Sequence, residues 1–315
     1  MIEQAINYNG SWEKKGRNIN AAAVAGLLGI GVFYFNGQTI VAIIGIVFVN
    51  IITPGLEASG NFMKRLTASI TLYAAPLRIA VVVSQYLFML LPALWLVKRW
   101  HTKNVREYIR LNRCSILEII LAVLATITII PFGTYISNEL IRWLKIPNEL
   151  LKINAELFTA YSLKEFIWLV FVVAITPAIC EEIFFRGYGQ RTFERTIKAK
   201  SVIVVGILFG LFHLQPLGLV TLSLLGILFC YFYYKSKSLL PSIAAHFSNN
   251  FLAIMVLYKS PQIGDLNLET ANQIPFSWVL VTLPISIGIL YLYPKAVKQH
   301  ISDSKKAKTY TELQR

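Results

Sequence analysis

Two adjacent carboxylates in apolar surroundings are the residues of this chain best suited to proton transfer. Glu181 and Glu182 follow an apolar run at 166–179, and Arg186 lies four residues after Glu182. On a helix, residues four apart share a face and can form an ion pair, whereas Glu181 is turned about 100° away from Glu182. We therefore expect Glu182 to pair with Arg186 and support the structure, while Glu181 remains able to act. A carboxylate in a low-dielectric setting holds a proton more readily, which suits a general base near neutral pH.

Two histidines in later apolar segments supply further groups for chemistry. His213 ends the segment 209–213, and His246 precedes Asn250 by four residues. His246 and Asn250 therefore share a helix face, while Asn249 is rotated off it. Counted from the nearest basic residues at 1.5 Å per residue, Glu181, His213 and His246 lie roughly 15, 20 and 13 Å from the same interface. This common depth predicts one shared site built from three helices.

The elements that position these residues are predicted to be membrane-spanning helices. Of the 315 residues, 56% are hydrophobic and 15% are charged, whereas a soluble domain carries roughly 25% charged residues. The apolar runs are long enough to cross a bilayer as helix, and they are continuous, which argues against a β-barrel. We therefore predict an all-α fold, a polytopic membrane helical bundle of about eight transmembrane helices. The predicted segments are 20–53, 77–97, 115–137, 165–184, 201–216, 217–234, 239–258 and 276–294.

The first predicted segment can be read in two ways. The residues at 36–38 near its middle could form a hairpin between two short spans, or 20–53 could cross the membrane once. A single crossing places the basic stretches 98–114, 186–200 and the tail from 295 on one side, which is the cytoplasmic side under the positive-inside rule. We therefore favour one span, with both termini cytoplasmic and the cell membrane as the location.

The formal net charge of +14 raises the question of nucleic-acid binding, but its distribution argues against it. The basic residues flank apolar runs in short loops and form no separate basic domain. We expect contact with anionic membrane lipid and no nucleic-acid partner. The predicted organisation is a cytoplasmic N-terminal segment at 1–19, a single transmembrane domain at 20–294 and a basic cytoplasmic tail at 295–315.

Other polar, small and reactive residues carry weaker signals. The three cysteines are scattered and give neither a disulfide framework nor a zinc spacing. Cys180 adjoins the glutamates and could be a nucleophile, but a buried cysteine is usually inert. His101 and His300 lie in basic flanks and are expected to be solvated. Gly206 and Gly210 form a small-residue pair that would let their helix approach a neighbour closely.

These residues together resemble the three ordered motifs of the type II CAAX prenyl endopeptidase and Abi family, also called the CAAX protease and bacteriocin-processing (CPBP) family. The motifs are Glu-Glu-xxx-Arg at 181–186, Phe-xxx-His at 209–213 and His-xxx-Asn at 246–250. The resemblance covers about 165–258, which is the expected catalytic core. It implies an eight-helix membrane fold with an intramembrane catalytic cavity that faces the cytosol.

The resemblance also implies a role for each motif residue. Glu181 and His213 would activate a water molecule that attacks the scissile carbonyl of a peptide or protein substrate. His246 and Asn250 would stabilise the tetrahedral oxyanion, the step at which preorganised donors contribute most. The pair of Glu182 and Arg186 would hold the glutamate-bearing helix in place.

A catalytic metal and two other functional classes stay as alternatives. Glu181, His213 and His246 are candidate zinc ligands, but the chain has no His-Glu-xx-His spacing and we expect no cofactor. A non-catalytic membrane binding or bacteriocin-immunity protein could use the same residues without turnover. A small transporter would be expected to show repeated halves, whereas the ionisable groups noted above lie only in the second half. We favour the intramembrane endopeptidase.

Overall fold

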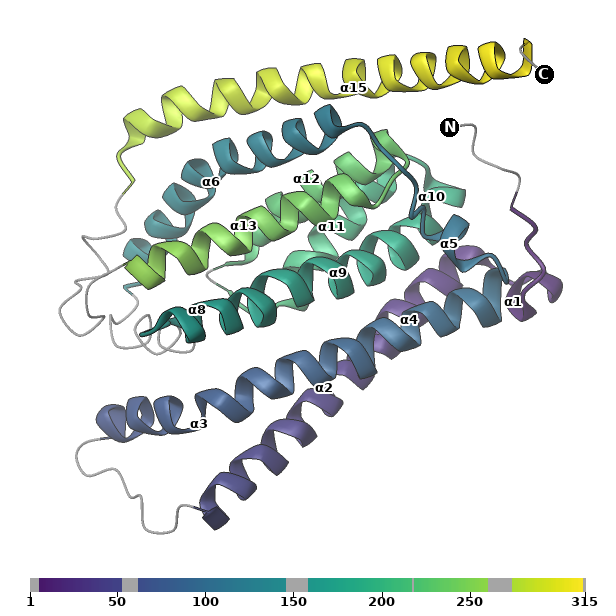
Figure 1. The fold of residues 1–315 in the computed structure, drawn as a ribbon. Coiled ribbons are helices and arrows are strands. Elements are labelled where there is room, and N and C mark those ends of the chain that lie inside the picture. The colour runs from purple at the N-terminus through teal and green to yellow at the C-terminus, as the bar shows by residue number, and fades with distance from the viewer. Residues whose placement is uncertain (1–5, 53–61, 146–157, 217, 260–273, 314–315) are drawn as a thin grey trace.

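The protein is built from helices. Its structure is a computed structural model that describes residues 6–52, 62–145, 158–216, 218–259 and 274–313 (Figure 1), and within these ranges it contains helices and no strands. Four stretches of π-helix continue α-helices without a break. In chain order, the elements are α1 (Ser11–Lys14), α2 (Ile19–Ile52), α3 (Phe62–Ser84), a π-helix (Gln85–Leu90), α4 (Leu91–Leu96), a π-helix (Val97–His101), α5 (Val105–Tyr108), α6 (Ile116–Leu144), α8 (Leu163–Leu169), a π-helix (Val170–Ile175), α9 (Thr176–Glu182), a π-helix (Ile183–Gln190), α10 (Arg191–Ile197), α11 (Lys200–Phe212), α12 (Leu219–Ser236), α13 (Leu240–Lys259) and α15 (Phe276–Leu313).

Within the part of the chain that the structure describes, seven helical segments are long and apolar enough to cross a membrane, judged by their length and composition. The sequence predicted eight, and the difference is α11, which is apolar but has only 13 residues. At 1.5 Å per residue α11 is about 20 Å long, shorter than a hydrocarbon core of about 30 Å. α11 is therefore too short to cross a membrane on its own, and His213 lies at its C-terminal end. The seven spans are Ile19–Ile52, Leu72–His101, Ile116–Leu144, Leu163–Ile197, Leu219–Ser236, Leu240–Tyr258 and Phe276–Ser302.

The first span is one helix. α2 runs without interruption through 36–38, so the segment is a single helix, as predicted, and no hairpin forms there. Gly37 is buried in the helix, and a Cβ atom at this position would lie 2.2 Å from the ring of Phe88. The glycine that suggested a turn in the sequence is therefore a point of close approach between α2 and the Gln85–Leu90 π-helix.

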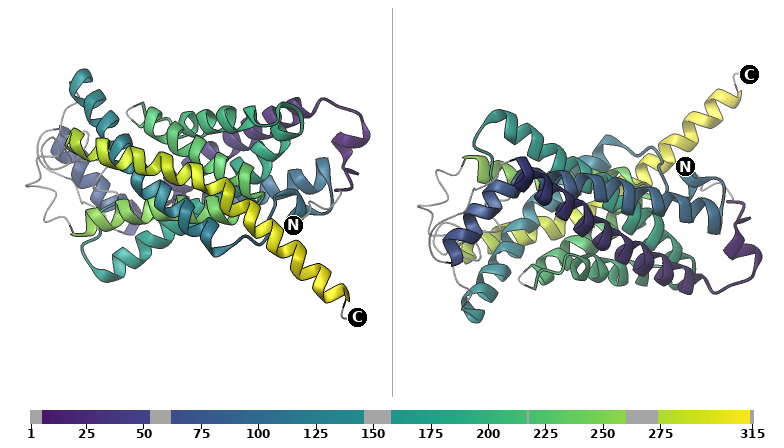
Figure 2. Two further views of the ribbon diagram at one scale, coloured as in Figure 1. Left: turned by 90° about the horizontal axis from the view of Figure 1, so that it is seen from above. Right: turned by 90° about the horizontal axis from the view of Figure 1, so that it is seen from below.

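Large apolar side chains cover much of the outer surface. Ile51, Ile116 and Trp143 are 71%, 73% and 78% exposed. Such exposure would be unfavourable in water but is expected for a surface that faces lipid. α15 packs on α6 and crosses the other helices obliquely, as the two views of Figure 2 show. The outer surface and the spans together describe an integral membrane helical bundle.

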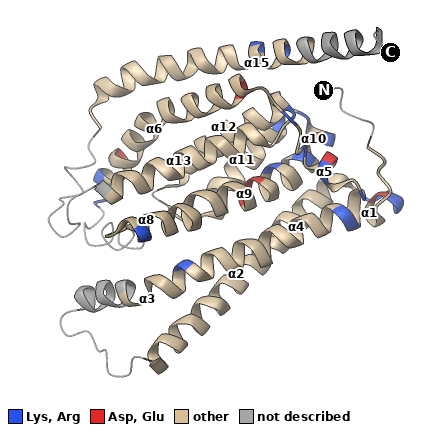
Figure 3. Cartoon of the chain, in the orientation of Figure 1, with Lys and Arg blue, Asp and Glu red and all other residues tan. Residues whose placement is uncertain are grey.

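One end of the bundle gathers most of the positive charge. α1, α5 and α10 lie together at this end, and Figure 3 shows lysine and arginine concentrated there. The basic stretches 98–114 and 186–200 thus lie at one end of the molecule. We refer to it as the basic end.

His101 at the basic end corrects an expectation from the sequence. It was expected to be solvated, but its side chain is fully buried and its Nδ1 lies 2.6 Å from Glu13 of α1. Burial alone raises the pKa of Glu13, but hydrogen bonds and charges from Arg195 and His101 outweigh burial and hold that pKa below its usual value. The N-terminal segment is therefore tied to the bundle through a buried ion cluster. His300 is partly exposed.

Backbone contact between α11 and α12 positions the Phe-xxx-His motif at 209–213. A Cβ atom added to Gly206 would lie 2.5 Å from the backbone nitrogen of Ile227 on α12, and one added to Gly226 would lie 2.4 Å from the carbonyl oxygen of Gly206. α11 and α12 therefore meet without intervening side chains, which confirms the close approach predicted from the Gly206–Gly210 pair. This contact fixes α11, and with it His213, against the helix that carries Phe229.

Candidate active site

Glu181 lies at the centre of a group of polar side chains buried within the bundle. It is 9% exposed and belongs to the last turn of α9. Its Oε1 accepts a hydrogen bond of 2.9 Å from Nε2 of Gln85. Its Oε2 is buried and has no hydrogen-bond partner among the described residues. One oxygen of the carboxylate is therefore fixed, and the other is left open to a reactant.

His213 faces that open oxygen. Its Nε2 lies 3.9 Å from Oε2 of Glu181, too far for a direct hydrogen bond. Its Nδ1 lies 2.7 Å from the carbonyl oxygen of Phe209, and because a carbonyl only accepts, Nδ1 must donate. In the neutral imidazole this leaves Nε2 as a proton acceptor. Two acceptors, one from each residue, thus face each other across a gap that a water molecule could bridge.

Glu182 is turned about 100° from Glu181 around the helix axis and is fully buried. Its Oε1 accepts hydrogen bonds of 2.8 Å from Arg186 and of 2.8 Å from Nδ1 of His246. Arg186 is also fully buried, donates to the carbonyl of Gly226 at 3.1 Å and lies over the ring of Phe209 at 4.5 Å. The predicted ion pair is therefore present, and it joins three helices.

His246 is held by this ion pair from α13. Its ring is stacked on Phe229, with centroids 5.2 Å apart, and meets Phe209 edge to face. Glu182 fixes Nδ1 as a donor, so Nε2 is the nitrogen that remains for a substrate. In neutral His246 that nitrogen accepts a hydrogen bond, and only the imidazolium form donates one.

Asn250 lies one turn after His246 and contacts the chain before the glutamates. Its Nδ2 donates a hydrogen bond of 2.8 Å to the carbonyl of Val173, in the Val170–Ile175 π-helix. Its Oδ1 accepts from Nδ2 of Asn249 at 3.0 Å. A π-helical turn disturbs the regular hydrogen-bond ladder, and such turns often occur at functional sites. The second hydrogen of each amide group remains for other partners.

A single cavity of about 440 Å³ connects these groups. It is lined by Glu181, His213, His246, Asn249 and Asn250. The remaining wall is mainly apolar and comes from α3, α9, α11, α12 and α13. The shared site predicted from equal depth is therefore present as a geometric arrangement, with Glu182 and Arg186 packed behind it.

A comparison with protein families agrees with this arrangement. Residues 163–252 match the family model described as type II CAAX prenyl endopeptidase Rce1-like. This part of the chain is CAAX protease-like. The matched segment contains every motif residue predicted from the sequence, from Glu181 to Asn250. No curated protein and no solved structure matches the chain. At the level of the family, the match indicates a membrane-embedded protease with a peptide or protein substrate.

Gln85 is a site residue that lies outside the CAAX protease-like segment and was missed in the sequence. It is 3% exposed, and its amide donates to Glu181 across 96 positions of the chain. The candidate site was predicted from ionisable side chains in apolar runs, and those side chains all lie in the second half of the chain. An uncharged amide inside an apolar run is also unfavourable in lipid, so Gln85 carried a usable signal.

The position of Asn249 also differs from the prediction. It was expected to be rotated away from the site, yet it lines the cavity and bonds to Asn250. A 100° rotation excludes a residue from a narrow stripe of helix surface, but it does not exclude it from a wide cavity. The CAAX protease-like segment therefore supplies two adjacent amides.

The candidate zinc ligands are not arranged as a metal site. Among the residues that the structure describes, no three histidine, cysteine, aspartate or glutamate side chains are grouped so that they could hold a metal ion. Nδ1 of His213 is hydrogen-bonded to the carbonyl oxygen of Phe209, and Nδ1 of His246 is hydrogen-bonded to Glu182.

Proposed function

We propose that the protein is an intramembrane endopeptidase in which Glu181 and His213 activate the water that hydrolyses a peptide bond. The observation that supports this most strongly is the position of Oε2 of Glu181, which has no hydrogen-bond partner among the described residues and faces Nε2 of His213 at 3.9 Å across the cavity. A water molecule between them can donate one hydrogen to each acceptor. Its lone pair then points away from both groups, towards a carbonyl carbon in the cavity.

The proposed reaction follows from these positions. Glu181 removes a proton as the water oxygen forms a bond to the carbonyl carbon, and the carbonyl oxygen becomes an oxyanion. The amide hydrogens of Asn250 and Asn249 and, when protonated, Nε2 of His246 can donate to that oxyanion. The proton held at the Glu181–His213 pair passes to the leaving nitrogen, and the C–N bond breaks. The products are a carboxylate and an amine, with one water consumed.

The apolar character of the cavity walls indicates which class of substrate would fit. They are largely apolar, with Val81 and Leu257 among them, and Arg78 is a charged residue that also lines the cavity. An apolar cavity favours an extended peptide with apolar side chains over a polar one. We propose that the basic end faces the cytosol, because positively charged loops are retained on that side. Both termini would then be cytoplasmic.

A non-catalytic binding or immunity protein is the second candidate. It would use the same cavity to hold a peptide and would not need an activated water. The position of Oε2 of Glu181 in the cavity, 3.9 Å from Nε2 of His213, favours catalysis, because a site that only binds a peptide does not need two acceptors aimed at one point.

Cleavage of a peptide library by the purified protein in detergent tests the proposal. Peptides with a fluorophore and a quencher are incubated with the wild type, with Glu181→Gln and with Glu139→Gln. Glu139 is an exposed carboxylate on α6 that pairs with Arg142 outside the cavity, so its variant is a matched control. We expect cleavage by the wild type and the control, and a rate at least about 100-fold lower for Glu181→Gln.

Two additional measurements separate the alternatives. A chelator in a parallel wild-type reaction should leave the rate unchanged, and loss of turnover that zinc restores would show a metal enzyme. Equal cleavage by Glu181→Gln and the wild type would contradict the proposed mechanism. Folded wild-type protein that binds library peptides but cleaves none would support the binding protein.

A further inference from the structure

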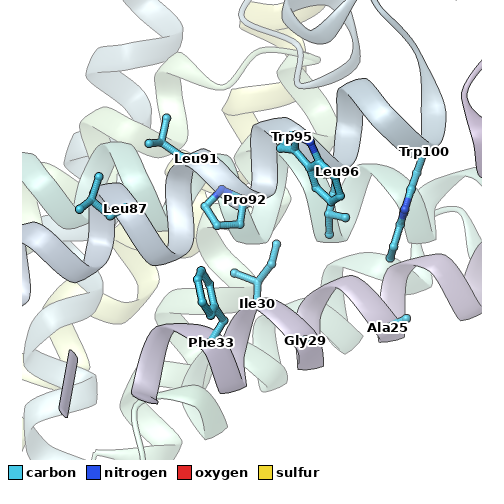
Figure 4. A pocket seen from close by; sticks show the side chains of 10 residues that line it. All are labelled: Ala25, Gly29, Ile30, Phe33, Leu87, Leu91, Pro92, Trp95, Leu96 and Trp100. Carbon is cyan, nitrogen blue, oxygen red and sulfur yellow. The ribbon is translucent and has the colours of Figure 1, made fainter. Parts of the chain in front are cut away.

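A second cavity lies on the opposite side of the Gln85–Leu90 π-helix from Glu181. It is an apolar groove of about 550 Å³ between α2 and the stretch from Leu87 to Trp100. Figure 4 shows Phe33 and Ile30 on α2 facing Trp95 and Leu96 across this space, with Trp100 at one end. Phe33, Leu91 and Trp95 are 51%, 54% and 59% exposed, so the groove is open along the outer surface of the bundle. We call it the α2–α4 groove.

The floor of the α2–α4 groove is formed by a small residue. A Cβ atom added to Gly29 would have no atom within 4 Å, so nothing in the described structure fills the space above it. A flexible apolar chain would fit there without displacing a side chain. Because the helices around the groove span the membrane, such a chain is at hand in the surrounding lipid.

A positively charged pocket adjoins the groove at the basic end. Its volume is about 460 Å³, and its wall includes Lys14, Lys98, Arg99 and Lys103. Trp95 belongs to the walls of both the pocket and the groove, so the two lie next to each other. All four cations are exposed, and within the described residues none of them forms an ion pair. The pocket therefore has uncompensated positive charge beside an apolar groove.

Contacts between α1 and the Val97–His101 π-helix give the pocket a fixed shape. The backbone nitrogen of Gly10 donates to the carbonyl of His101 at 2.9 Å, and the hydroxyl of Ser11 donates to the carbonyl of Arg99 at 2.9 Å. The rings of Trp12 and Trp100 pack with centroids 4.8 Å apart. These contacts hold the backbone that carries the cations before any ligand binds.

We propose that the α2–α4 groove and the adjoining pocket bind one anionic glycerophospholipid, with an acyl chain in the groove and the phosphate group among the cations. Lysine and arginine next to a membrane surface attract anionic lipid headgroups, and tryptophan is enriched at the level where chain and headgroup meet. A zwitterionic lipid offers the same chain but no net charge to match Lys98, Arg99 and Lys103. The basic pocket thus selects the headgroup, and the groove retains the chain.

Native mass spectrometry of the purified full-length protein tests this proposal. Dioleoyl phosphatidylglycerol and dioleoyl phosphatidylcholine are titrated separately, and inorganic phosphate is added as a competitor without an acyl chain. The variant Lys98→Gln, Arg99→Gln, Lys103→Gln is compared with Arg113→Gln, Lys200→Gln, Lys298→Gln. The second set also removes three exposed cations but leaves the pocket unchanged. Gly29→Leu, which fills the groove, is compared with Gly288→Leu, where an added Cβ also meets no atom within 4 Å.

We expect the wild type to bind one phosphatidylglycerol at least about tenfold more tightly than phosphatidylcholine. The pocket variant should lose this preference, and Gly29→Leu should weaken binding of both lipids, while both controls behave as the wild type. Equal binding of the two lipids, or equal losses in the two charge variants, would overturn the proposal. Complete competition by phosphate would indicate a site for a free anion, and a change of oligomeric state in Gly29→Leu alone would indicate a protein partner. Either result would also overturn it.

Discussion

Glu181 and Glu182 are neighbours in the chain, but the structure gives their carboxylates different surroundings. Glu182 is fully buried and accepts hydrogen bonds from Arg186 and His246. Glu181 accepts one bond from an amide and directs its other oxygen into the cavity. The carboxylate of Glu182 is packed behind the cavity against Arg186 and His246, whereas that of Glu181 offers an acceptor to a reactant in the cavity. The two residues are therefore expected to fail in different ways when they are replaced.

Glu182→Ala should destabilise the protein. It leaves the guanidinium of Arg186 buried without its carboxylate and removes the hydrogen bond that orients His246. Removal of one partner of a buried ion pair costs about 3–5 kcal/mol. Thermal unfolding followed by tryptophan fluorescence should show a clearly lower Tm. The double variant Glu182→Leu, Arg186→Met removes both charges and should recover part of the loss, and no recovery would show that the pair does not explain the effect.

Asn250 and Asn249 should contribute unequally to catalysis. The side-chain amide of Asn250 donates to Val173 and accepts from Asn249, so both its nitrogen and its oxygen are held. The amide of Asn249 is held only by its hydrogen bond to Asn250. Loss of a preorganised oxyanion donor lowers kcat by about 100- to 1,000-fold. We expect that loss for Asn250→Ala and a smaller one for Asn249→Ala, in each case with little change in KM. A raised KM with an unchanged kcat would instead mean that the amides bind substrate in its ground state.

The residues that could be predicted from the sequence are those whose presence in an apolar run is costly. Glu181, His213, His246 and Asn250 were found in this way, and the structure places them around one cavity. Gln85 and Asn249 were not found, for two reasons. A neutral amide is a weaker signal than a charge, and helical spacing gives the direction of a side chain but not the width of the cavity it faces.

At the scale of elements, π-helical turns and glycines set the positions of the motifs. The Gln85–Leu90 π-helix contributes Gln85 to Glu181 and Leu87 to the α2–α4 groove. The Val170–Ile175 π-helix supplies the carbonyl that holds Asn250. Spacing along the sequence gave the helices and the approach at Gly206, but it did not give the π-helical turns, since these depend on tertiary contacts as well as on local preference.

Gly210→Leu should disturb the packing of α11 on α12. A Cβ at this position would lie 2.8 Å from the backbone nitrogen of Ser223 and 2.9 Å from the carbonyl oxygen of Leu219, and a helix backbone cannot yield as a side chain can. We expect a lower Tm and a loss of cleavage, because His213 follows three residues later. Gly288→Leu is the matched control, and equal behaviour of the two variants in thermal unfolding would contradict this account of the helix contact.

At the scale of the whole molecule, the basic end and the cavity are parts of one arrangement. The single helix of α2 and the gathering of basic stretches at one end follow from apolar length and charge, which are local properties of the sequence. The number of spans did not follow from them, because eight were predicted and the described residues contain seven. The shortness of α11 and the burial of His101 depend on contacts with distant segments, such as those between α11 and α12 and between Glu13 and His101. These could not be predicted from one segment at a time. The wall of the cavity comes from α3 as well as from the CAAX protease-like segment, so it also depends on contacts between distant parts of the chain.

The central claim is that Glu181 and His213 act on the same water molecule. It is tested most directly by a double-mutant cycle on kcat with Glu181→Gln, His213→Ala and the double variant. A peptide that the wild type cleaves serves as substrate, under single-turnover conditions that allow slow rates to be followed. Groups that act as a unit lose their effect together, so the double variant should be about as slow as the slower single variant. Losses that multiply, or a wild-type rate in Glu181→Gln, would contradict the account.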